Sequence, residues 1–451
     1  MRDLIVFGIV MLTLPTAFKR PFVGLLLFSW LAYMRPQDLC WGFARGMRFS
    51  FFVAVTMVVG WFVNESHKRR FFAPETRSYL LLAMGVFISI SLLFAETRST
   101  RYYFEFIKII AISLFTISQV DSKLRLRALL WVICGSLAFY SVKNGLVGLT
   151  KGGTVIIRGP GGMLEDNNDF ALALVMNIPL LFFLSRLEKN VLVRKACLIA
   201  IGLTMVTVLL THSRGGFLAM STTVAWIAFR SGRLMQAGFV LIGLVIGFFL
   251  LAPAHVIDRI LSMSEGAKDS SVASRFESWM VGIRMAIDNP MWGVGLRNFI
   301  DNAQAYGMQG SGEQLHVAHN SFIQIAAEGG GIAFITYMTL LLSVFWAALW
   351  LRRVAKVRPD LYWAGHYAAM FETINLGFMV GGTFLNRGHF DLIYHFLALV
   401  GSTVLVVRRS LAMGPVEETA SEGAPARAGP VTVAWRSPNV AVAMPRWERT
   451  T

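Results

Sequence analysis

The chain has 451 residues, of which 55% are hydrophobic and only 15% are charged, and its mean hydropathy is +0.58. Soluble domains carry about a quarter charged residues, so this composition excludes an ordinary soluble protein. The net charge of +16 fits the basic cytoplasmic loops of a membrane protein better than nucleic-acid binding. Three scattered cysteines, Cys40, Cys134 and Cys197, exclude a disulfide framework and a zinc pattern.

Apolar runs that could form membrane helices recur along the chain. In order they are 4–18, 21–34, 49–64, 78–95, 102–120, 128–149, 169–185, 193–210, 215–230, 236–254, 322–351, 361–384 and 390–407. A bilayer span requires roughly 20 apolar residues, and an open chain crosses only as helix. The first runs are short, so 4–34 could hold two spans or one re-entrant hairpin. No small-residue cleavage site follows the first run, which indicates an anchor and not a removed signal. The sequence predicts an all-α, polytopic membrane helix bundle of about 12–13 spans.

Loop charge predicts the orientation of the bundle. One alternating set of loops carries 21 basic residues and the opposite short segments carry 10, so the first set is expected in the cytoplasm. Residues 255–320 then form one large periplasmic loop within a membrane domain of residues 1–410. A helix is expected from about 275 to 288, because Ser274 and Glu277 make a capping box and Asn289-Pro290 ends it. Residues 411–451 are expected to be a disordered cytoplasmic tail.

The segment Thr211-His212-Ser213-Arg214-Gly215-Gly216-Phe217 lies between two spans on the outer side. The following span begins here, and a helix N-terminus offers free N–H groups and partial positive charge. The two glycines would let a ligand approach the backbone, and the Arg214 guanidinium suits bidentate phosphate contact. The segment predicts an anion site at the membrane surface. A polar turn with a snorkelling arginine is the alternative.

The segment His316-Val317-Ala318-His319-Asn320-Ser321 closes the large outer loop. Asn320 or Ser321 is suited to cap the next helix, which places His319 at a helix N-terminus. Positive potential there keeps an imidazole neutral, and a neutral imidazole is a competent general base. Half a metal site or an incidental capping turn are the alternatives, but no further Cys or His cluster supports a metal.

The outer segments contribute further polar residues. In loop 151–168, Arg158 with nearby glycines could form an anion nest, and Glu165, Asp166, Asn167 and Asn168 could accept sugar hydroxyls. We expect Asp169 to cap the next span. The large loop adds Arg275, in the first turn of its helix, with Arg284 and Arg297, and segment 384–391 adds Arg387, His389 and Asp391. Lys143 lies toward the outer end of its span and could reach a phosphate, whereas Glu105 and Lys108 are spaced for an internal ion pair.

The chain resembles the O-antigen ligase and polymerase superfamily of bacterial inner-membrane glycosyltransferases. The resemblance rests on Ser213-Arg214-Gly215-Gly216, the single large outer loop and His319-Asn320-Ser321. Met1-Arg2-Asp3-Leu4, Tyr33-Met34-Arg35-Pro36 and Gly159-Pro160…Asp166-Asn167-Asn168 resemble a branch of O-glycosylation ligases associated with exosortase systems. The resemblance covers about residues 1–410. Members usually have about twelve spans with both termini inside, which leaves the count in residues 1–64 open.

The resemblance implies glycan transfer from undecaprenyl diphosphate to an acceptor at the periplasmic face, without metal, cofactor or nucleotide sugar. Arg214 and Arg275 match the arginines that contact the diphosphate, and His319 matches the essential histidine; Arg284 or Arg297 could replace Arg275. The implied substrate-binding residues are Ser213, Gly215, Gly216, Arg158, Lys143, Asn167, Asn168, Arg297, His316, Asn320, Arg387 and His389.

The preferred acceptor is lipid A–core oligosaccharide, which implies lipopolysaccharide biosynthesis. A protein side chain (protein O-oligosaccharyltransferase) or a growing glycan (O-antigen polymerase) stay open as acceptors. A transporter or flippase for a lipid-linked solute predicts charges deep in the spans and inverted repeats. We identify Glu105, Lys108, Lys143 and Glu372 in or near spans, and no repeat is evident, which favours an enzyme. A passive scaffold is the third alternative.

Overall fold

The computed structural model is helical in the part of the chain that it describes. The described residues are 1–65, 76, 78–93, 100–151, 156–231, 270–309 and 316–413, with scattered residues between 235 and 247. Among them, the one extended pairing is an isolated bridge between Arg158 and Asp166. The predicted all-α class is confirmed.

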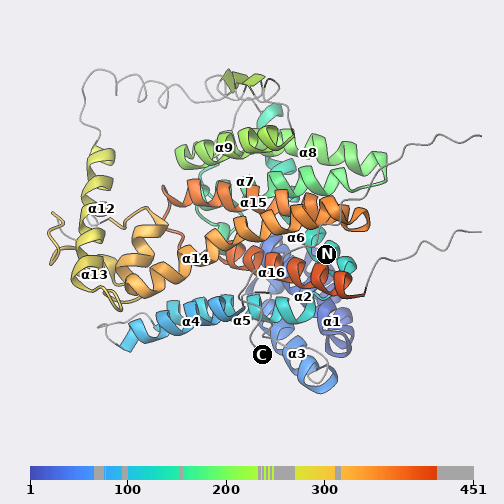
Figure 1. The fold of residues 1–451 in the computed structure, drawn as a ribbon, viewed down its shortest axis with the longest axis horizontal. Coiled ribbons are helices and arrows are strands. Elements are labelled where there is room, and N and C mark those ends of the chain that lie inside the picture. Colours follow the sequence, from blue (N-terminus) through green and yellow to red (C-terminus); the bar gives the residue numbers. More distant parts are fainter. Residues whose placement is uncertain are drawn as a thin grey trace, which may run out of the picture. The chain divides into compact units, whose positions relative to one another are not determined.

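The helices follow the predicted apolar runs closely (Figure 1). They are α1 (Arg2–Lys19), α2 (Pro21–Tyr33), α3 (Phe49–Asn64), α4 (Ser78–Leu93), α5 (Thr100–Gln119), α6 (Lys123–Thr150), α7 (Asn167–Arg186), α8 (Val191–Leu210), α9 (Arg214–Arg230), α12 (Ser270–Asp288), α13 (Phe299–Ala303), α14 (Ser321–Val357), α15 (Tyr362–Gly382) and α16 (Asp391–Ala412). Twelve of the thirteen predicted spans coincide with one of these helices. The run at 236–254 and the tail from 414 lie largely or wholly outside the described residues.

Five of the described helices, α6, α7, α8, α14 and α16, are long and apolar enough to cross a membrane. The chain is therefore a polytopic membrane bundle. The N-terminal region holds three separate helices, and Arg20 alone stands between α1 and α2. With 13 residues, α2 reaches only about 20 Å, which is short of the bilayer core.

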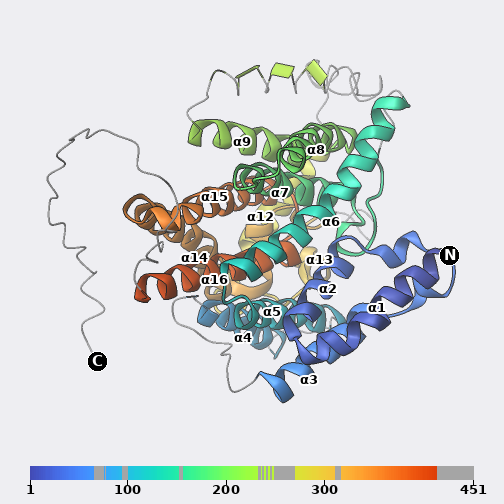
Figure 2. The same cartoon turned by 90° about the vertical axis from the view of Figure 1, so that its right-hand side faces the viewer.

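The core of the bundle surrounds α7. Sixteen of the twenty residues of α7 are buried, and the helix contacts α6, α8, α9 and α15. Figure 2 shows α7, α15 and α16 between the pair α8 and α9 on one side and α4 and α5 on the other. The outer helices carry exposed leucine, isoleucine and phenylalanine side chains, as lipid-facing surfaces do.

The two ends of the bundle differ in their polar groups. At one end, the buried carboxylate of Glu372 in α15 forms ion pairs with Arg230 of α9 and Arg352 of α14. These two ion pairs, which we call the Arg230–Glu372–Arg352 clamp, connect α9, α14 and α15. At the other end, α12 runs across the bundle and packs on α13 and α14 (Figure 1). The N-termini of α7, α9, α14 and α16 meet at this second end, which we call the polar end.

Helix α14 is broken at Gly330, whose φ of 76° and ψ of −179° are not helical. The break divides a half-helix, 321–329, from a long span, 331–357. Segment 290–295 covers the break, and two of its backbone amides donate to carbonyl groups of the half-helix at 2.8 and 3.0 Å. Protein groups thus satisfy the backbone that the break exposes, as burial near a membrane requires.

Candidate functional site

The N-terminus of α9 carries Arg214 at the polar end. The Ser213 hydroxyl caps the helix and accepts from Gly216 N at 3.0 Å. Arg214 is exposed in the first turn. A Cβ on Gly215 would lie 2.9 Å from Phe384 Cβ, and one on Gly216 would lie 2.7 Å from Ala171 Cβ. The glycines therefore let α9 pack closely on its neighbours, which is a different reason from the open approach that the sequence suggested.

The N-terminus of α14 carries His319. Asn320 is its N-cap, as expected, and accepts from the amides of Phe322 at 3.0 Å and Ile323 at 3.2 Å. His319 itself is half-buried and has a left-handed φ of 45°. Within the described ranges, no hydrogen bond to its ring is found. The half-buried ring therefore lies directly before the α14 N-cap.

Charged neighbours act on the His319 imidazole. Burial lowers its pKa below the usual value, and Arg275 and then His316 lower it further, whereas the Asp166 carboxylate opposes them. Arg275, His316 and Asp166, which come from three distant parts of the chain, therefore all lie close enough to His319 to act on it electrostatically. A lowered pKa keeps the ring neutral near pH 7, the form that accepts a proton.

Helix α12 places Arg275 differently from the sequence prediction. The helix begins at Ser270, so the predicted capping box is wrong, and Arg275 lies in the second turn and not the first. Glu277 instead accepts from Gln309 N at 2.8 Å. Helix α12 ends at Asp288, as predicted from Asn289-Pro290.

Two alternative arginines of the large loop are engaged elsewhere. Arg284 donates to the carbonyl of Tyr306 at 3.1 Å. Arg297 stands over the Tyr102 ring at 5.0 Å and has a left-handed φ of 63°. Of these three loop arginines, Arg275 is the one whose positive charge acts on His319.

The loop before α7 supplies the carboxylate near His319. Asp166, not Asp169, is the N-cap of α7, and it accepts from the amides of Asn168 and Asp169. The prediction that Asp169 caps the helix is therefore wrong. The exposed Arg158 pairs with Asp166 through the backbone bridge. Asn167 donates to the Thr211 carbonyl at 2.9 Å, which ties this loop to the turn before Arg214.

Asp169 and Arg387 form an ion pair with each other instead of the contacts that the sequence predicted. Asp169 is buried and forms a two-pronged ion pair with Arg387 from the turn between α15 and α16. The amide of Arg387 also donates to Ser321 Oγ at 3.0 Å. Arg387 thus joins α7 to the start of α14, and much of its guanidinium is already committed to a protein carboxylate.

His389 lies inside the protein. Its side chain is 9% exposed, its ring packs edge-on against Phe106 at 4.8 Å, and its Nε2 is 3.6 Å from Glu328 Oε2. Burial lowers its pKa. Sequence analysis placed His389 among the substrate-binding residues, but the structure shows it as a buried partner of Glu328, so direct contact would require the site to open.

Sequence analysis missed Glu328 and Gln324. Gln324 Nε2 donates to Glu328 Oε2 at 3.2 Å, and Gly388 N donates to Gln324 Oε1 at 3.1 Å. Both side chains are buried in the half-helix of α14. The signal available in the sequence was Glu328 followed by three glycines inside an apolar run, a pattern that predicts a helix break with a buried charge.

Other predicted residues are less closely joined to the site. Asn168 donates to Asn167 Oδ1 at 3.1 Å and so lies beside it. Lys143 is exposed on α6, and no described contact links it to the polar end. Glu105 and Lys108 are both exposed on α5, and the ion pair expected between them is absent from the described contacts.

Backbone strain gathers at the polar end. Among the described non-glycine residues, Arg35, His212, Arg297 and His319 have a positive φ. Three of them belong to the segments that carry Arg214, the large loop and the α14 cap. Such conformations cost on the order of 1–3 kcal/mol each and tend to occur at functional sites.

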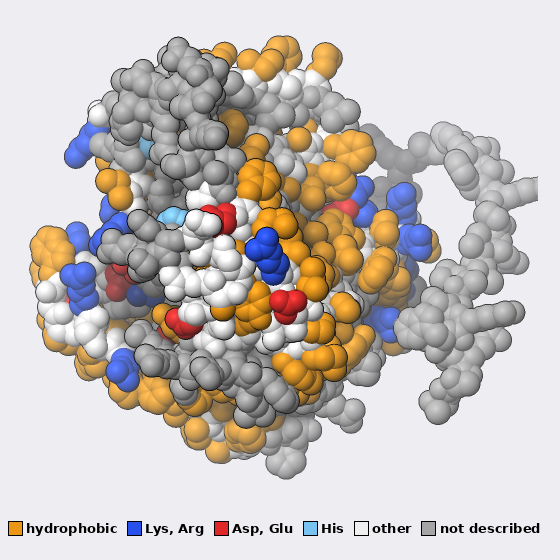
Figure 3. All heavy atoms as spheres, turned by 90° about the vertical axis from the view of Figure 1, so that its left-hand side faces the viewer, with side chains coloured by type: hydrophobic (Ala, Val, Ile, Leu, Met, Phe, Trp, Pro, Cys, Tyr) orange, Lys and Arg blue, Asp and Glu red, His pale blue; other side chains and the backbone are white. Residues whose placement is uncertain are grey.

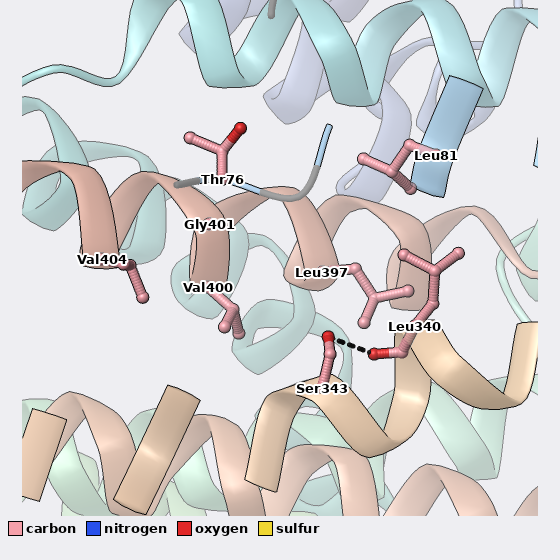
Figure 4. Close-up of a pocket in the computed structure, with 8 residues that line it drawn as sticks. All are labelled: Thr76, Leu81, Leu340, Ser343, Leu397, Val400, Gly401 and Val404. Carbon is pink, nitrogen blue, oxygen red and sulfur yellow. Dashed lines mark hydrogen bonds between the residues drawn. The ribbon is translucent and has the colours of Figure 1, made fainter. Parts of the chain in front are cut away.

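Figure 3 shows the polar end from outside, where histidine, acidic and basic side chains lie among other polar atoms and hydrophobic side chains cover much of the right-hand and lower rim. The arrangement offers cations for an anionic group and a neutral imidazole for proton removal. A pocket between helices of the bundle lies apart from the candidate site (Figure 4). It is lined mainly by apolar residues of α14 and α16, and Ser343 Oγ donates there to Leu340 O at 2.7 Å. None of its lining residues belongs to the candidate site.

Comparison with known protein families divides the chain in two. Residues 198–338 match the family model described as O-Antigen ligase. Residues 1–189 match a family of unknown function. No curated protein matches the chain. The first match contains Arg214, Arg275 and His319, whereas Asp166 and the loop before α7 fall in the second.

Proposed function

We propose that this chain, whose residues 198–338 match the O-antigen ligase family model, is a glycosyltransferase of the ligase or polymerase type. It transfers a glycan from undecaprenyl diphosphate to an acceptor hydroxyl. The preferred acceptor is lipid A–core oligosaccharide. The observation that carries the proposal is the half-buried His319, which directly precedes the α14 N-cap Asn320 and lies within the electrostatic reach of Arg275 and Asp166.

The chemistry assigns one role to each group. The neutral His319 imidazole takes the proton from the acceptor hydroxyl, whose oxygen forms a bond to the anomeric carbon of the glycan. The bond from that carbon to the lipid diphosphate breaks, and its electron pair leaves on the diphosphate. Arg214 and Arg275 stabilise the developing charge, which is usually the largest contribution to such a reaction. A single displacement of this kind inverts the anomeric centre.

The proposed location is a bacterial inner membrane with the polar end in the periplasm. Loop charge supports it, because the more basic loops are expected in the cytoplasm. The Arg230–Glu372–Arg352 clamp lies at the end assigned to the cytoplasm, and His319 lies at the opposite end. The prenyl tail of the donor would lie in the bilayer beside the bundle.

The test is glycan transfer by the purified protein. Lipid-linked glycan would be incubated with lipid A–core oligosaccharide, an acceptor protein or a second lipid-linked glycan, with and without EDTA. We expect transfer to the first acceptor, undiminished by EDTA and with inversion. Transfer to one of the others would change the acceptor and keep the enzyme class. A protein that binds the lipid-linked glycan but transfers it to none of them would refute the proposal.

A further inference from the structure

One loop of the N-terminal segment that matches the family of unknown function reaches the candidate site at His319. Residues 156–166 lead from the end of α6 to the N-cap of α7, and Asp166 at their end is the carboxylate that acts on His319. This loop is built around glycines, which by themselves give little rigidity. Its position must therefore be set by what it rests on.

The loop rests on an arginine–aspartate pair that follows α2. Arg35 Nε lies 2.5 Å from Asp38 Oδ2, and both side chains are about a quarter exposed, at 26% and 24%. Arg35 has a left-handed φ of 48°. The residue before it is anchored, because Tyr140 OH of α6 donates to the Met34 carbonyl at 2.6 Å. This hydrogen bond ties the segment that carries the pair to α6.

Two glycines of the loop lie directly on this pair. Gly161 and Gly162 have φ values of 111° and 57°, which other residues rarely adopt. A Cβ on Gly162 would overlap Arg35 Nη1, and one on Gly161 would lie 3.0 Å from Asp38 Oδ2. The guanidinium and the carboxylate therefore support the backbone of the turn at contact distance.

The far end of the loop connects both catalytic helix ends. Gly159 N donates to the Glu165 carbonyl at 2.8 Å, which closes the loop on itself. Asn167 then bonds to the turn before Arg214, at Thr211. Asp169 pairs with Arg387, whose amide bonds to Ser321 two residues after His319. One short stretch of chain thus sets the α9 and α14 N-termini relative to each other.

We propose that Arg35 and Asp38 are positioning residues for glycan transfer. This pair, which we call the brace, supports the Gly161-Gly162 turn and so fixes the positions of the α9 and α14 N-termini, with Arg214 and His319, relative to each other. This gives the segment of unknown function a part in the reaction. The inference rests on the proposed function for its chemistry, but the brace itself is a property of the fold.

The brace also predicts a change in pH dependence. Three charged or titratable groups act on His319: Arg275 on α12, His316 on the same loop and Asp166 on the braced loop. Asp166 is the one that raises the pKa of His319. When the brace is lost and Asp166 moves away, that pKa falls further. The acid limb of the rate profile then moves to lower pH, while the maximal rate drops because the helix ends are misplaced.

The experiment compares Arg35→Ala, Arg35→Lys, Asp38→Asn and Gly162→Ala with the wild type, in the full-length protein in detergent or vesicles. Arg45→Ala is the matched control, since Arg45 is an exposed arginine on the same connection between α2 and α3. Amide hydrogen exchange of residues 156–169 and 319–324 measures the brace without any substrate. Transfer rate against pH, with kcat and KM separated, measures its effect on chemistry.

We expect Arg35→Ala and Gly162→Ala to raise exchange in both segments and to lower kcat about 10- to 100-fold, with the acid limb shifted to lower pH. Arg35→Lys should fall between them and the wild type, and Arg45→Ala should match the wild type. Unchanged exchange in Arg35→Ala overturns the brace. Increased exchange with normal kcat, or activity that falls only with the amount of folded protein and keeps its pH profile, overturns the positioning role. If the wild type transfers nothing, the proposed function fails while the exchange result still judges the brace.

Discussion

Replacement of His319 by asparagine is the most direct test of the proposed base. The left-handed φ of 45° at this position decides the choice of variant. For alanine that conformation costs about 1–2 kcal/mol, whereas asparagine adopts it more readily because its short polar side chain can hydrogen-bond locally. His319→Asn therefore removes the base and leaves the backbone of the α14 cap in place. A loss of activity then reports on proton transfer and not on a rearranged helix end.

The size of the loss follows from the role. General base catalysis contributes about 10²–10⁴-fold, which corresponds to about 3–5 kcal/mol of the barrier. We expect His319→Asn to lower kcat by that range with KM for the lipid-linked donor little changed. His316→Ala, at the exposed end of the same segment, should cost much less.

The pH profile provides a second reading. Burial and the positive charge of Arg275 lower the pKa of His319 from its usual value. The neutral ring is the active form, so the wild-type rate should stay full at neutral pH and fall only as pH drops through that lowered pKa. The variant should lose this acid limb. The assay is transfer rate against pH, with donor binding measured in parallel. Wild-type turnover by His319→Asn, or a loss explained wholly by donor binding, would refute the base assignment.

Three further outcomes can be checked. Arg214→Lys keeps the charge but loses the planar fork, so it should be severely impaired in transfer, and Arg214→Ala should fold but weaken donor binding or turnover; normal transfer by the alanine variant would reduce the segment to a turn. A reporter fused at residue 410 should be found in the cytoplasm and one inserted near 268 in the periplasm, and opposite locations at both would invert the bundle. Arg387→Ala leaves the buried Asp169 carboxylate without its partner. The loss of stability is about 3–5 kcal/mol for a fully buried pair, and it should be smaller here because Arg387 is 31% exposed. Thermal unfolding should show this loss and Asp169→Asn in the same background should recover part of it, whereas an unchanged melting temperature would contradict the pairing.

The helices were predictable because hydropathy is a local property. Twelve apolar runs became helices, and Asn320 capped α14 as its position indicated. The convergence of Arg275 and His319 was expected from the topology and the family resemblance. These features depend on residues near one another in sequence, or on a charge bias summed over many loops.

The errors came from partners that lie far away in sequence. Asp169 looks like a helix cap from its neighbours, but Arg387, more than 200 residues later, takes it as an ion-pair partner. Ser274 and Glu277 have the spacing of a capping box, yet Glu277 bonds to Gln309 and the helix starts earlier. The Arg35–Asp38 brace is likewise invisible without knowing that Gly161 and Gly162 rest on it.

The break at Gly330 also bears on how the protein tolerates different membranes. A continuous helix responds to a thinner or thicker bilayer by tilting, and a tilt would carry its end along. We expect the span 331–357 to tilt about Gly330, where Gly331 N donates to Pro290 O at 2.7 Å, while the half-helix 321–329 stays bonded to segment 290–295 and keeps His319 in place. Transfer rates in vesicles of short and long acyl chains should therefore differ little. A strong dependence of kcat on chain length would mean that the two halves move as one rod.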